Sequence, residues 1–448
     1  MLNSNVNLWL IADSSSNDIE QQKQLSEKGM KIIILDHHEI SDSEEIDNVI
    51  IVNNQIVKNE SSVYAGVGVV AQWIRALGYP IDKYVDLVAI GLIADAMTTV
   101  SLANRYYINE GLDNLNNELI KEFFKDFKHP IIENVSFNCA NLINSVIRYG
   151  EFEEKELLWK AITNQEGTVE YKNRKGEVVQ QTLQEGFARI ANNVKSRQNN
   201  AIKKAVKKIE EHIYKYGLDK DKCIIIENDG IVESGIGGIV CQKLSSNFKR
   251  PVMILSPYND EMSGSTRSPF PLRDLLIESE LVIFAQGHEC AFGTSLVKEN
   301  IPKLREYLNI KLRDFSVDEK VEDVDYVFNC KDLKLDQVKD VANLEKLWGK
   351  DCQEPIFIVK GITIESCKME YKKSGICYCT QFTHNGVTYK KRFCSKVVYE
   401  EMTRKADLKF GRSQQLDLVL LVKFKKERGF YYAEILDFNS VKSSKVIF

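Results

Sequence analysis

Short apolar runs alternate with amphipathic stretches along the first hundred residues. The apolar run at 8–12 is followed by a helical pattern at 18–28 and by a second apolar run at 31–35. Another helix is predicted at 66–77, and the run at 85–93 is apolar enough to be a third strand, buried on both faces. Strands and helices joined by short turns predict an α/β fold with a doubly wound parallel sheet.

The middle of the chain is predicted to contain a helical region, a connecting helix and a second α/β unit. Residues 114–190 are mostly helical in pattern, and a Lys- and Glu-rich helix follows at 198–216, ending at Gly217. Its polarity suits a connection between domains, and its apolar stripe comprises Ile202, Ala205, Ile209 and Ile213. The second α/β unit is predicted from apolar runs at 223–226, 235–244, 251–255 and 281–284.

After about residue 314 the pattern changes to short strands separated by polar turns. Five such runs with interleaved lysines and aromatics predict a small, oligonucleotide-binding (OB)-like β-barrel, with strands at 356–364, 375–383, 389–393, 416–424 and 431–438. The expected domains are therefore 1–190, a connecting helix at 191–217, 218–313 and 314–448.

Composition indicates a cytoplasmic protein with no membrane segment. The chain has 448 residues, of which 44% are hydrophobic and 28% charged, as in ordinary globular proteins. It lacks a run of about 20 apolar residues, which a membrane helix needs. Its ten cysteines form no paired framework, which predicts reduced thiols and argues against a zinc site.

Charge is unevenly distributed along the chain. The net charge is −4, but residues 360–448 contain 18 Lys and Arg against 9 Asp and Glu, a surplus of +9. A basic C-terminal part beside an acidic remainder favours binding of a phosphate backbone by the C-terminal part. The alternative is an ordinary solvated surface.

Candidate metal ligands follow the predicted strands. Asp36, His37 and His38 come directly after the run at 31–35, Asp13 follows the first strand, and Asp95 follows the third apolar run. Carboxylates and imidazoles at the carboxyl ends of parallel strands suit Mn²⁺, or Mg²⁺ with weaker nitrogen binding. Each residue alone has a commoner explanation, such as a helix N-cap for Asp13. Their combination predicts a metal site.

These blocks resemble the DHH phosphoesterase family, and within it the RecJ-type single-strand-specific exonucleases. The resemblance covers nearly the whole chain in one order: residues 12–18 (ADSSSND), the DHH of 36–38, 66–78 (GVGVVAQWIRALG), 91–105 (GLIADAMTTVSLANR), 109–116 (NEGLDNLN), 235–244 (GIGGIVCQKL), 264–268 (GSTRS), 286–293 (QGHECAFG) and 347–357 (LWGKDCQEPIF). It implies an N-terminal DHH domain, a DHH-associated substrate domain and the OB-like barrel.

The resemblance also implies roles at a two-metal site. Asp13 is expected to bridge two Mn²⁺ or Mg²⁺ ions, and His37 and Asp95 to complete one of the two ligand sets. His38 is expected to contact the scissile phosphate or the attacking water, and Asp36 to orient a histidine. Two ions at such a site activate water and neutralise charge on the phosphate.

Substrate-binding residues are implied in three further segments. Arg267 and His288 are expected to hold the phosphate backbone, beside glycines that allow close approach. The alternatives are a surface ion pair for Arg267 and a buried structural histidine for His288. The full expected set is Arg105, Asn144, Arg148, Gly264, Ser265, Arg267, Ser268, Gly287 and His288.

Aromatic residues of the C-terminal domain are candidates for stacking on bases. They lie among lysines, as in proteins that bind single strands without strong sequence preference. The alternative is that they fill the barrel core. The residues are Tyr371, Tyr378, Phe382, Tyr389 and Phe393.

The chain departs from the family pattern before Asp13. RecJ-type enzymes open with a strand bearing an Asp-x-Asp motif, whereas the twelve residues before Asp13 contain no acidic residue and no histidine. The two-metal site is thus expected to be incomplete, and one sheet edge to be uncovered. Gln286 also stands where the family usually has glycine. Three interpretations remain: a fragment or split gene product that needs an N-terminal polypeptide as partner, a truncated form, or a degenerate homologue.

The sequence therefore predicts a metal-dependent 5′–3′ exonuclease that hydrolyses single-stranded DNA in recombination or repair in a bacterium or phage. Two alternatives remain open. One is a DHH-family phosphodiesterase for short oligonucleotides or cyclic dinucleotides, which has no need of a basic C-terminal domain. The other is a non-catalytic module that binds single-stranded DNA.

Overall fold

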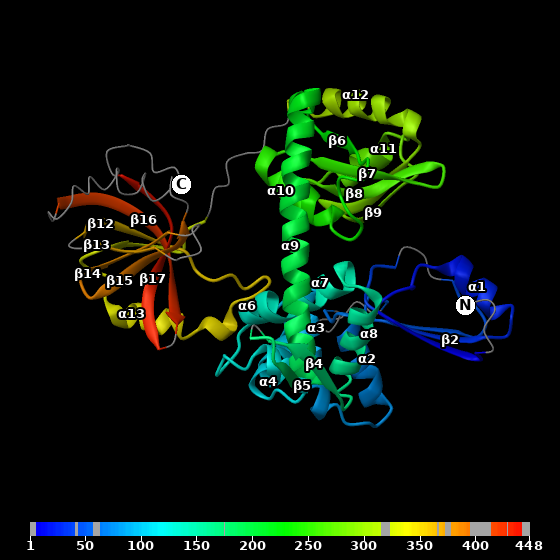
Figure 1. Ribbon diagram of the computed structural model, residues 1–448, viewed down its shortest axis with the longest axis horizontal. Helices are drawn as coiled ribbons and strands as arrows, with labels where there is room; N and C mark the ends of the chain where they lie inside the picture. The colour runs from blue at the N-terminus through cyan, green and yellow to red at the C-terminus, as the bar shows by residue number, and fades with distance from the viewer. Residues whose placement is uncertain are drawn as a thin grey trace. The chain divides into compact units, whose positions relative to one another are not determined.

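The chain forms two compact units in the computed structural model. Figure 1 labels its helices and strands. Unit 1 comprises Met1–Asn116, Phe127–Ser136 and Lys320–Phe448, and unit 2 comprises Asn117–Asp126 and Phe137–Glu319. The structure describes residues 6–440 except 41–43, 57–62, 174, 315–322, 365–366, 372–377, 395–413 and 428. Within these residues, no helix is both long enough and apolar enough to cross a membrane.

Unit 1 begins with a three-stranded parallel sheet in the order β1-β2-β3. Its elements are β1 (Leu8–Ala12), α1 (Ile19–Ser26), β2 (Lys31–Asp36) and β3 (Val49–Asn53). Leu25 and Met30 pack with Ile32 and Ile34 in a buried cluster. The parallel arrangement and the first two strands were predicted correctly. β3 was not predicted, although its sequence, VIIVN, has the same apolar character.

The apolar run at 85–93 is a helix, and its prediction as a strand was wrong. α3 (Val85–Ala94) is buried along most of its length, because α2 (Gly66–Ala76) and α4 (Leu102–Asp113) pack against it. A helix that is apolar all round is buried all round, and a run of ten residues is longer than most strands. Gly111 lets α4 approach α3 closely, because a Cβ there would lie 2.6 Å from the Cβ of Ala89.

The C-terminal part of unit 1 is a seven-stranded sheet in the order β11-β12-β16-β17-β15-β14-β13. All five predicted strands occur in it, together with β11 and β13; residues 375–377 of the predicted second strand lie outside the described residues. The elements of this region are η5 (Glu345–Leu347), β11 (Tyr326–Asn329), α13 (Leu335–Ala342), β12 (Phe357–Ile364), β13 (Cys367–Tyr371), β14 (Tyr378–His384), β15 (Val387–Cys394), β16 (Gln414–Glu427) and β17 (Phe430–Ser440).

Two of the five candidate stacking aromatics belong to the core of this sheet. Phe382 and Tyr389 are buried and stack on each other, with ring centroids 5.2 Å apart. Burial raises the pKa of Tyr389. Neither ring can receive a base without unfolding of the core, so the prediction of base stacking was wrong for these two. The side chains of Tyr371, Tyr378 and Phe393 lie outside the described residues.

Unit 2 combines helices with a five-stranded sheet. The long helix α9 (Leu183–Tyr216) begins with Thr182 as N-cap and ends at Gly217, whose φ of 69° is left-handed. The predicted helix at 198–216 is its second half (Figure 1). The preceding elements are α5 (Glu118–Phe123), α7 (Asn141–Tyr149), α8 (Phe152–Ile162), β4 (Thr168–Lys172) and β5 (Val178–Thr182).

The sheet of unit 2 has the order β6-β7-β8-β10-β9. β6 and β7 are parallel, and the other neighbouring strands are antiparallel. The predicted strand at 281–284 begins only at Phe284. The elements are β6 (Ile224–Glu227), α10 (Gly237–Phe248), β7 (Val252–Tyr258), β8 (Glu261–Arg267), α11 (Arg273–Glu278), β9 (Phe284–His288), β10 (Ala291–Leu296) and α12 (Ile301–Lys311).

Candidate metal centre and candidate phosphate site

Asp13 lies where β1 ends, in a backbone conformation that presents its carboxylate to the neighbouring strand. Its φ is 62°, and its amide donates to the carbonyl of Leu35 at 2.8 Å. Aspartate accepts this left-handed conformation more readily than most residues do. The first residue of α2, Gly66, packs directly on the carboxylate: a Cβ there would lie 2.7 Å from the Cγ of Asp13.

His37 lies between two carboxylates that come from different elements. Its Nε2 is 3.3 Å from an oxygen of Asp13 and 3.3 Å from an oxygen of Asp95. Asp95 is the C-cap residue of α3, not the end of a strand. The hydrogen bond with Asp13 raises the pKa of His37, against the opposing effect of burial, and the charge of Asp95 adds to the rise. The electrostatic field at Nε2 thus favours a cation.

Asp36 forms hydrogen bonds with both of the histidines that follow it. It is buried and accepts hydrogen bonds from the backbone amides of Ser16 (3.2 Å) and His37 (2.8 Å). Its Oδ1 is also hydrogen-bonded to Nδ1 of His38, at 2.7 Å. Burial alone would raise the pKa of Asp36, but its hydrogen bonds with His38, Ser16 and His37 outweigh that effect and lower the pKa to about 2. The carboxylate is therefore ionised, and its bond with Nδ1 fixes the orientation of the His38 ring.

The predicted site residues meet in one place. Ligand atoms of Asp13, His37 and His38 all lie within 4.8 Å of one another, and Asp95 joins them through His37. The carboxylates of Asp13 and Asp95 and the imidazole of His37 fit Mn²⁺ by donor type, and the lack of a thiolate in this cluster argues against softer metals. The carboxylate of Asp13 occupies the space that a Cβ at Gly66 would need. The glycine therefore allows Asp13 to keep its position beside His37.

A supporting layer was not predicted. The Asn53 side chain donates to the carbonyl of His38 (2.9 Å) and to the hydroxyl of Ser16 (3.0 Å), and Gln55 donates to the carbonyl of His37 (3.3 Å). These bonds fix the backbone of the histidine pair. The signal that could have revealed them was the polar pair that follows the apolar run of β3, since the ends of parallel strands share one sheet edge.

We expect Asp36→Asn to weaken both the fold and metal binding. The asparagine amide lacks the negative charge toward which the Ser16 amide, the His37 amide and Nδ1 of His38 point. We expect this loss to lower the free energy of unfolding by about 1–3 kcal/mol. Asp36 also accepts a hydrogen bond from the amide of the proposed ligand His37, and loss of an orienting partner of a ligating histidine typically lowers metal affinity about 10–100-fold. Urea unfolding and Mn²⁺ titration measure the two effects. Asp18→Asn, at an exposed N-cap without a side-chain capping bond, is the matched control and should change neither. Equal Mn²⁺ affinity of the two variants would contradict the role of Asp36.

A second candidate site lies on the sheet of unit 2. Arg267 and His288 both pair with Ala291, on either side of β10, so their side chains emerge on the same face. The next row on that face is Ser265, Gly293 and Gln286. Ala291 and Gly293 of β10 therefore leave open space on the sheet between the guanidinium of Arg267 and the imidazole of His288. His288 is exposed, so it is not a buried structural histidine.

Arg267 has no carboxylate partner among the described ion pairs, and a second arginine lies near it. Burial lowers the pKa of Arg267, and the charge of Arg148 lowers it further. The guanidinium packs against the start of α10, where a Cβ at Gly238 would be 2.8 Å from its nitrogen. Two arginines and a helix N-terminus make a region that favours an anion.

The other predicted substrate-binding residues have varied environments. Arg105 donates from Nε to the carbonyl of Thr99 at 3.0 Å, which ties it to the loop after Asp95. Asn144 is exposed on α7, next to a buried serine. Gly264 lies against the carbonyl of Ile254, and Gly287, with φ of 132°, presents its own carbonyl to Arg273 at 2.7 Å. Ser268 is buried, and its hydroxyl accepts from the amide of Phe270.

Comparisons with known proteins identify similar sequences. A sequence model of the DHH family, N-terminal domain, matches residues 3–92. The chain is 29% identical over 405 residues to the putative SPbeta prophage-derived single-strand DNA-specific exonuclease YorK of Bacillus subtilis, covering 86% of this chain and 70% of that protein. It is 27% identical to the single-stranded-DNA-specific exonuclease RecJ of the same organism, covering 81% of this chain and 45% of RecJ.

The fold resembles that of a solved RecJ structure. RecJ of Thermus thermophilus in complex with Mn²⁺ superposes with a TM-score of 0.71 at 17% sequence identity. The match covers 98% of this chain but 62% of the T. thermophilus chain, so this chain spans less than two thirds of that protein. The sequence blocks and these relatives agree: residues 3–92 match the DHH family, N-terminal domain, and the chain as a whole is similar to RecJ-type single-strand DNA-specific exonucleases.

Proposed function

We propose that this protein is a Mn²⁺-dependent exonuclease that degrades single-stranded DNA from its 5′ end. The observation that carries the proposal is the placing of His37 Nε2 3.3 Å from carboxylates of both Asp13 and Asp95. The B. subtilis relatives are named as single-strand DNA-specific exonucleases, and the T. thermophilus RecJ structure contains Mn²⁺.

Asp13, His37 and Asp95 would hold the metal, and His38 would serve the phosphate or the attacking water. A divalent ion in this set would activate water and offset negative charge on the phosphate. Metal binding needs a neutral imidazole, so binding would release the proton that the two carboxylates favour on His37. Asp36 keeps Nδ1 of His38 occupied, which leaves Nε2 of that ring to face the substrate.

Arg267, Arg148 and His288 would hold the DNA backbone in unit 2. The guanidinium of Arg267 can bind a phosphate through two nitrogens. Ala291 and Gly293 of β10 have little or no side chain on this face, so the sugar-phosphate chain would have room to lie across the sheet. Asn144, Gly264, Ser265, Ser268 and Gly287 would complete this surface of unit 2, and Arg105 would contribute to substrate binding within unit 1. The C-terminal sheet, with its surplus of lysines and arginines, would act as an OB-like domain that binds the strand electrostatically.

A second metal ion would share Asp13 and take its other ligands from a separate N-terminal segment. Two features support such a partner. β1 has one hydrogen-bonded neighbour, β2, among the described strands. One face of the sheet also exposes Leu8, Leu10 and Ile50, whose side chains are 53%, 55% and 59% accessible. A strand of that segment would pair with the β1 edge, and an apolar element connected to the strand would cover the exposed face.

The test uses single-stranded DNA labelled at either end, with Mn²⁺ or with chelator. We expect a 5′-labelled strand to release labelled mononucleotide at once, while a 3′-labelled strand shortens progressively and a duplex resists. Release from the 3′ end first would contradict the polarity. Salt-sensitive binding without Mn²⁺-dependent cleavage, even when a polypeptide carrying an Asp-x-Asp strand is added, would show a binding module instead. Hydrolysis confined to dinucleotides would favour the small-substrate alternative.

A further inference from the structure

The loop that carries Asp95 also contacts a turn that lies 250 residues later in the sequence. Residues 95–101 connect α3 with α4, and residues 349–352 form a turn between η5 and β12. The amide of Thr99 donates to the carbonyl of Lys350 at 2.9 Å, and its hydroxyl donates to the same carbonyl at 2.9 Å. Thr99 is buried as a result, with 4% of its surface exposed.

The turn is shaped to fit this loop. Gly349 and Cys352 are joined by two backbone hydrogen bonds, of 2.8 and 3.2 Å, which close the turn on itself. A Cβ at Gly349 would lie 2.5 Å from the Cγ2 of Thr99 and 3.0 Å from the Cδ1 of Ile132, so only glycine fits without displacement. Asp351 has a left-handed φ of 63°, and the hydroxyl of Thr98 hydrogen-bonds its carboxylate, which lowers the pKa of Asp351.

The loop is held on its inner side as well. Asn104, fully buried in α4, donates to the carbonyl of Thr98 at 3.0 Å and to that of Val63 at 2.8 Å, and Arg105 donates to the carbonyl of Thr99. Ala96, directly after Asp95, is in a left-handed conformation with φ of 52°. A non-glycine residue keeps this conformation only where its surroundings impose it. Fixation at Thr98 and Thr99 supplies that restraint.

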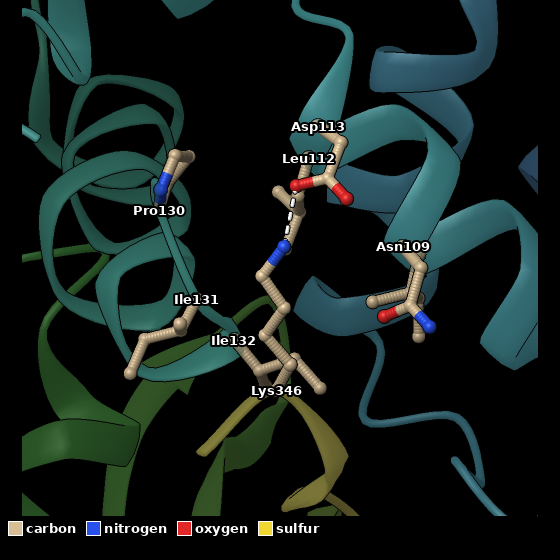
Figure 2. Close-up of a pocket in the computed structure, with 8 residues that line it drawn as sticks. Asn109, Leu112, Asp113, Pro130, Ile131, Ile132 and Lys346 are labelled. Atoms are coloured by element: carbon tan, nitrogen blue, oxygen red, sulfur yellow. Dashed lines mark hydrogen bonds and ion pairs between the residues drawn. The ribbon is translucent and has the colours of Figure 1, made fainter. Parts of the chain in front are cut away.

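A separate ion pair anchors the element before the turn. Figure 2 shows the Lys346 side chain of η5 directed at Asp113 of α4, with Nζ and the carboxylate 2.6 Å apart. The residues around it, Ile108, Leu112, Pro130, Ile131 and Ile132, border a small hollow. Both groups are nearly half exposed, so the pair contributes little to stability. It contacts α4 but not the 95–101 loop, which makes it a control for the turn.

We propose that the 349–352 turn is a positioning device for the metal ligand Asp95, with Thr99 and Gly349 as the positioning residues. The turn lies directly before β12, so it connects the C-terminal sheet with the loop that carries Asp95, and both belong to unit 1. The inference rests on the proposed function in taking Asp95 as a ligand. Its structural claim, that the turn orders the 95–101 loop, does not depend on catalysis.

The first test is amide hydrogen exchange of the metal-free protein, compared between wild type and Thr99→Val. Valine keeps the shape of threonine and removes the hydroxyl donor. We expect exchange across 95–101 to accelerate by about 10-fold, as loss of one net hydrogen bond of about 1.4 kcal/mol would allow. Thr99→Ser, which restores the donor, should return exchange toward the wild-type rate. Lys346→Met should leave this loop unchanged. Unaltered exchange in Thr99→Val would overturn the proposal.

The second test is Mn²⁺ affinity, measured by the electron paramagnetic resonance signal of free Mn²⁺. We expect Thr99→Val and Gly349→Ala to weaken Mn²⁺ binding about 10-fold, in the range typical of residues that orient ligands, whereas Lys346→Met keeps the wild-type affinity. A fall in unfolding free energy with unchanged Mn²⁺ affinity would reduce the turn to a structural role and overturn the proposal. If wild type itself binds no Mn²⁺, the proposed function fails, and faster loop exchange in Thr99→Val would still support the ordering of the loop.

Discussion

His37→Ala is expected to lower the affinity of the protein for Mn²⁺ by at least about 100-fold and to abolish Mn²⁺-dependent cleavage of single-stranded DNA. The imidazole lies 3.3 Å from both Asp13 and Asp95. Without the imidazole, the carboxylates of Asp13 and Asp95 have no group between them. The proposed set of metal ligands also loses its nitrogen donor. Removal of a residue that merely orients a ligand costs about 10–100-fold in metal affinity, so removal of a ligand should cost more.

Isothermal titration with Mn²⁺ measures the effect, and His129→Ala is the matched control. His129 is also in unit 1 and exposed, and the metal cluster does not include it. The control should bind Mn²⁺ and cleave DNA as wild type does. Wild-type Mn²⁺ affinity in His37→Ala would contradict the assignment of His37 as a ligand, whatever happened to cleavage.

Gly66→Ala is expected to impair metal binding while the protein stays folded. At an ordinary helix position, alanine is favoured over glycine by about 1 kcal/mol, so a neutral site would show a small gain in stability. At Gly66 the added Cβ would lie 2.7 Å from Cγ and 2.8 Å from Cβ of Asp13. Asp13 must then move, and its carboxylate leaves the position 3.3 Å from His37.

We expect this displacement to weaken Mn²⁺ binding at least about 10-fold. Circular dichroism checks that the fold is kept, and the same titration measures Mn²⁺ affinity. Gly167→Ala is the control, because its Cβ would meet only a Leu183 methyl at 3.7 Å, an ordinary contact. Mn²⁺ affinity in Gly66→Ala equal to that of the control would show that Asp13 does not need its observed position.

The residues of the candidate metal cluster could be located from the sequence because they follow apolar runs that end close together. Asp13 and the 36–38 segment carry that signal in the sequence itself. Asp95 was found by the same reasoning, although the element that it ends is a helix. Asp95 lies beside His37 in either case, because a strand and a helix can both place their C-terminal residue there, while periodicity cannot distinguish a buried strand from a buried helix.

Contacts between distant segments could not be predicted in the same way. Gly66 approaches Asp13 across 53 residues, and Thr99 meets Lys350 across 251, so no local pattern records either contact. The aromatic residues of the C-terminal sheet show a related limit. Phe382 and Tyr389 alternate with polar residues as a stacking surface would. A half-buried strand has the same alternation, and both rings lie in the core.

The most direct test of the account is anomalous X-ray scattering at the manganese edge from crystals of the protein grown with MnCl₂. We predict a manganese peak within coordination reach of Asp13, His37 and Asp95, with the His38–Asp36 hydrogen bond retained beside it. A peak elsewhere in the molecule, or well-ordered crystals with these three side chains in place and no manganese between them, would contradict the central claim that this sheet edge is the metal centre.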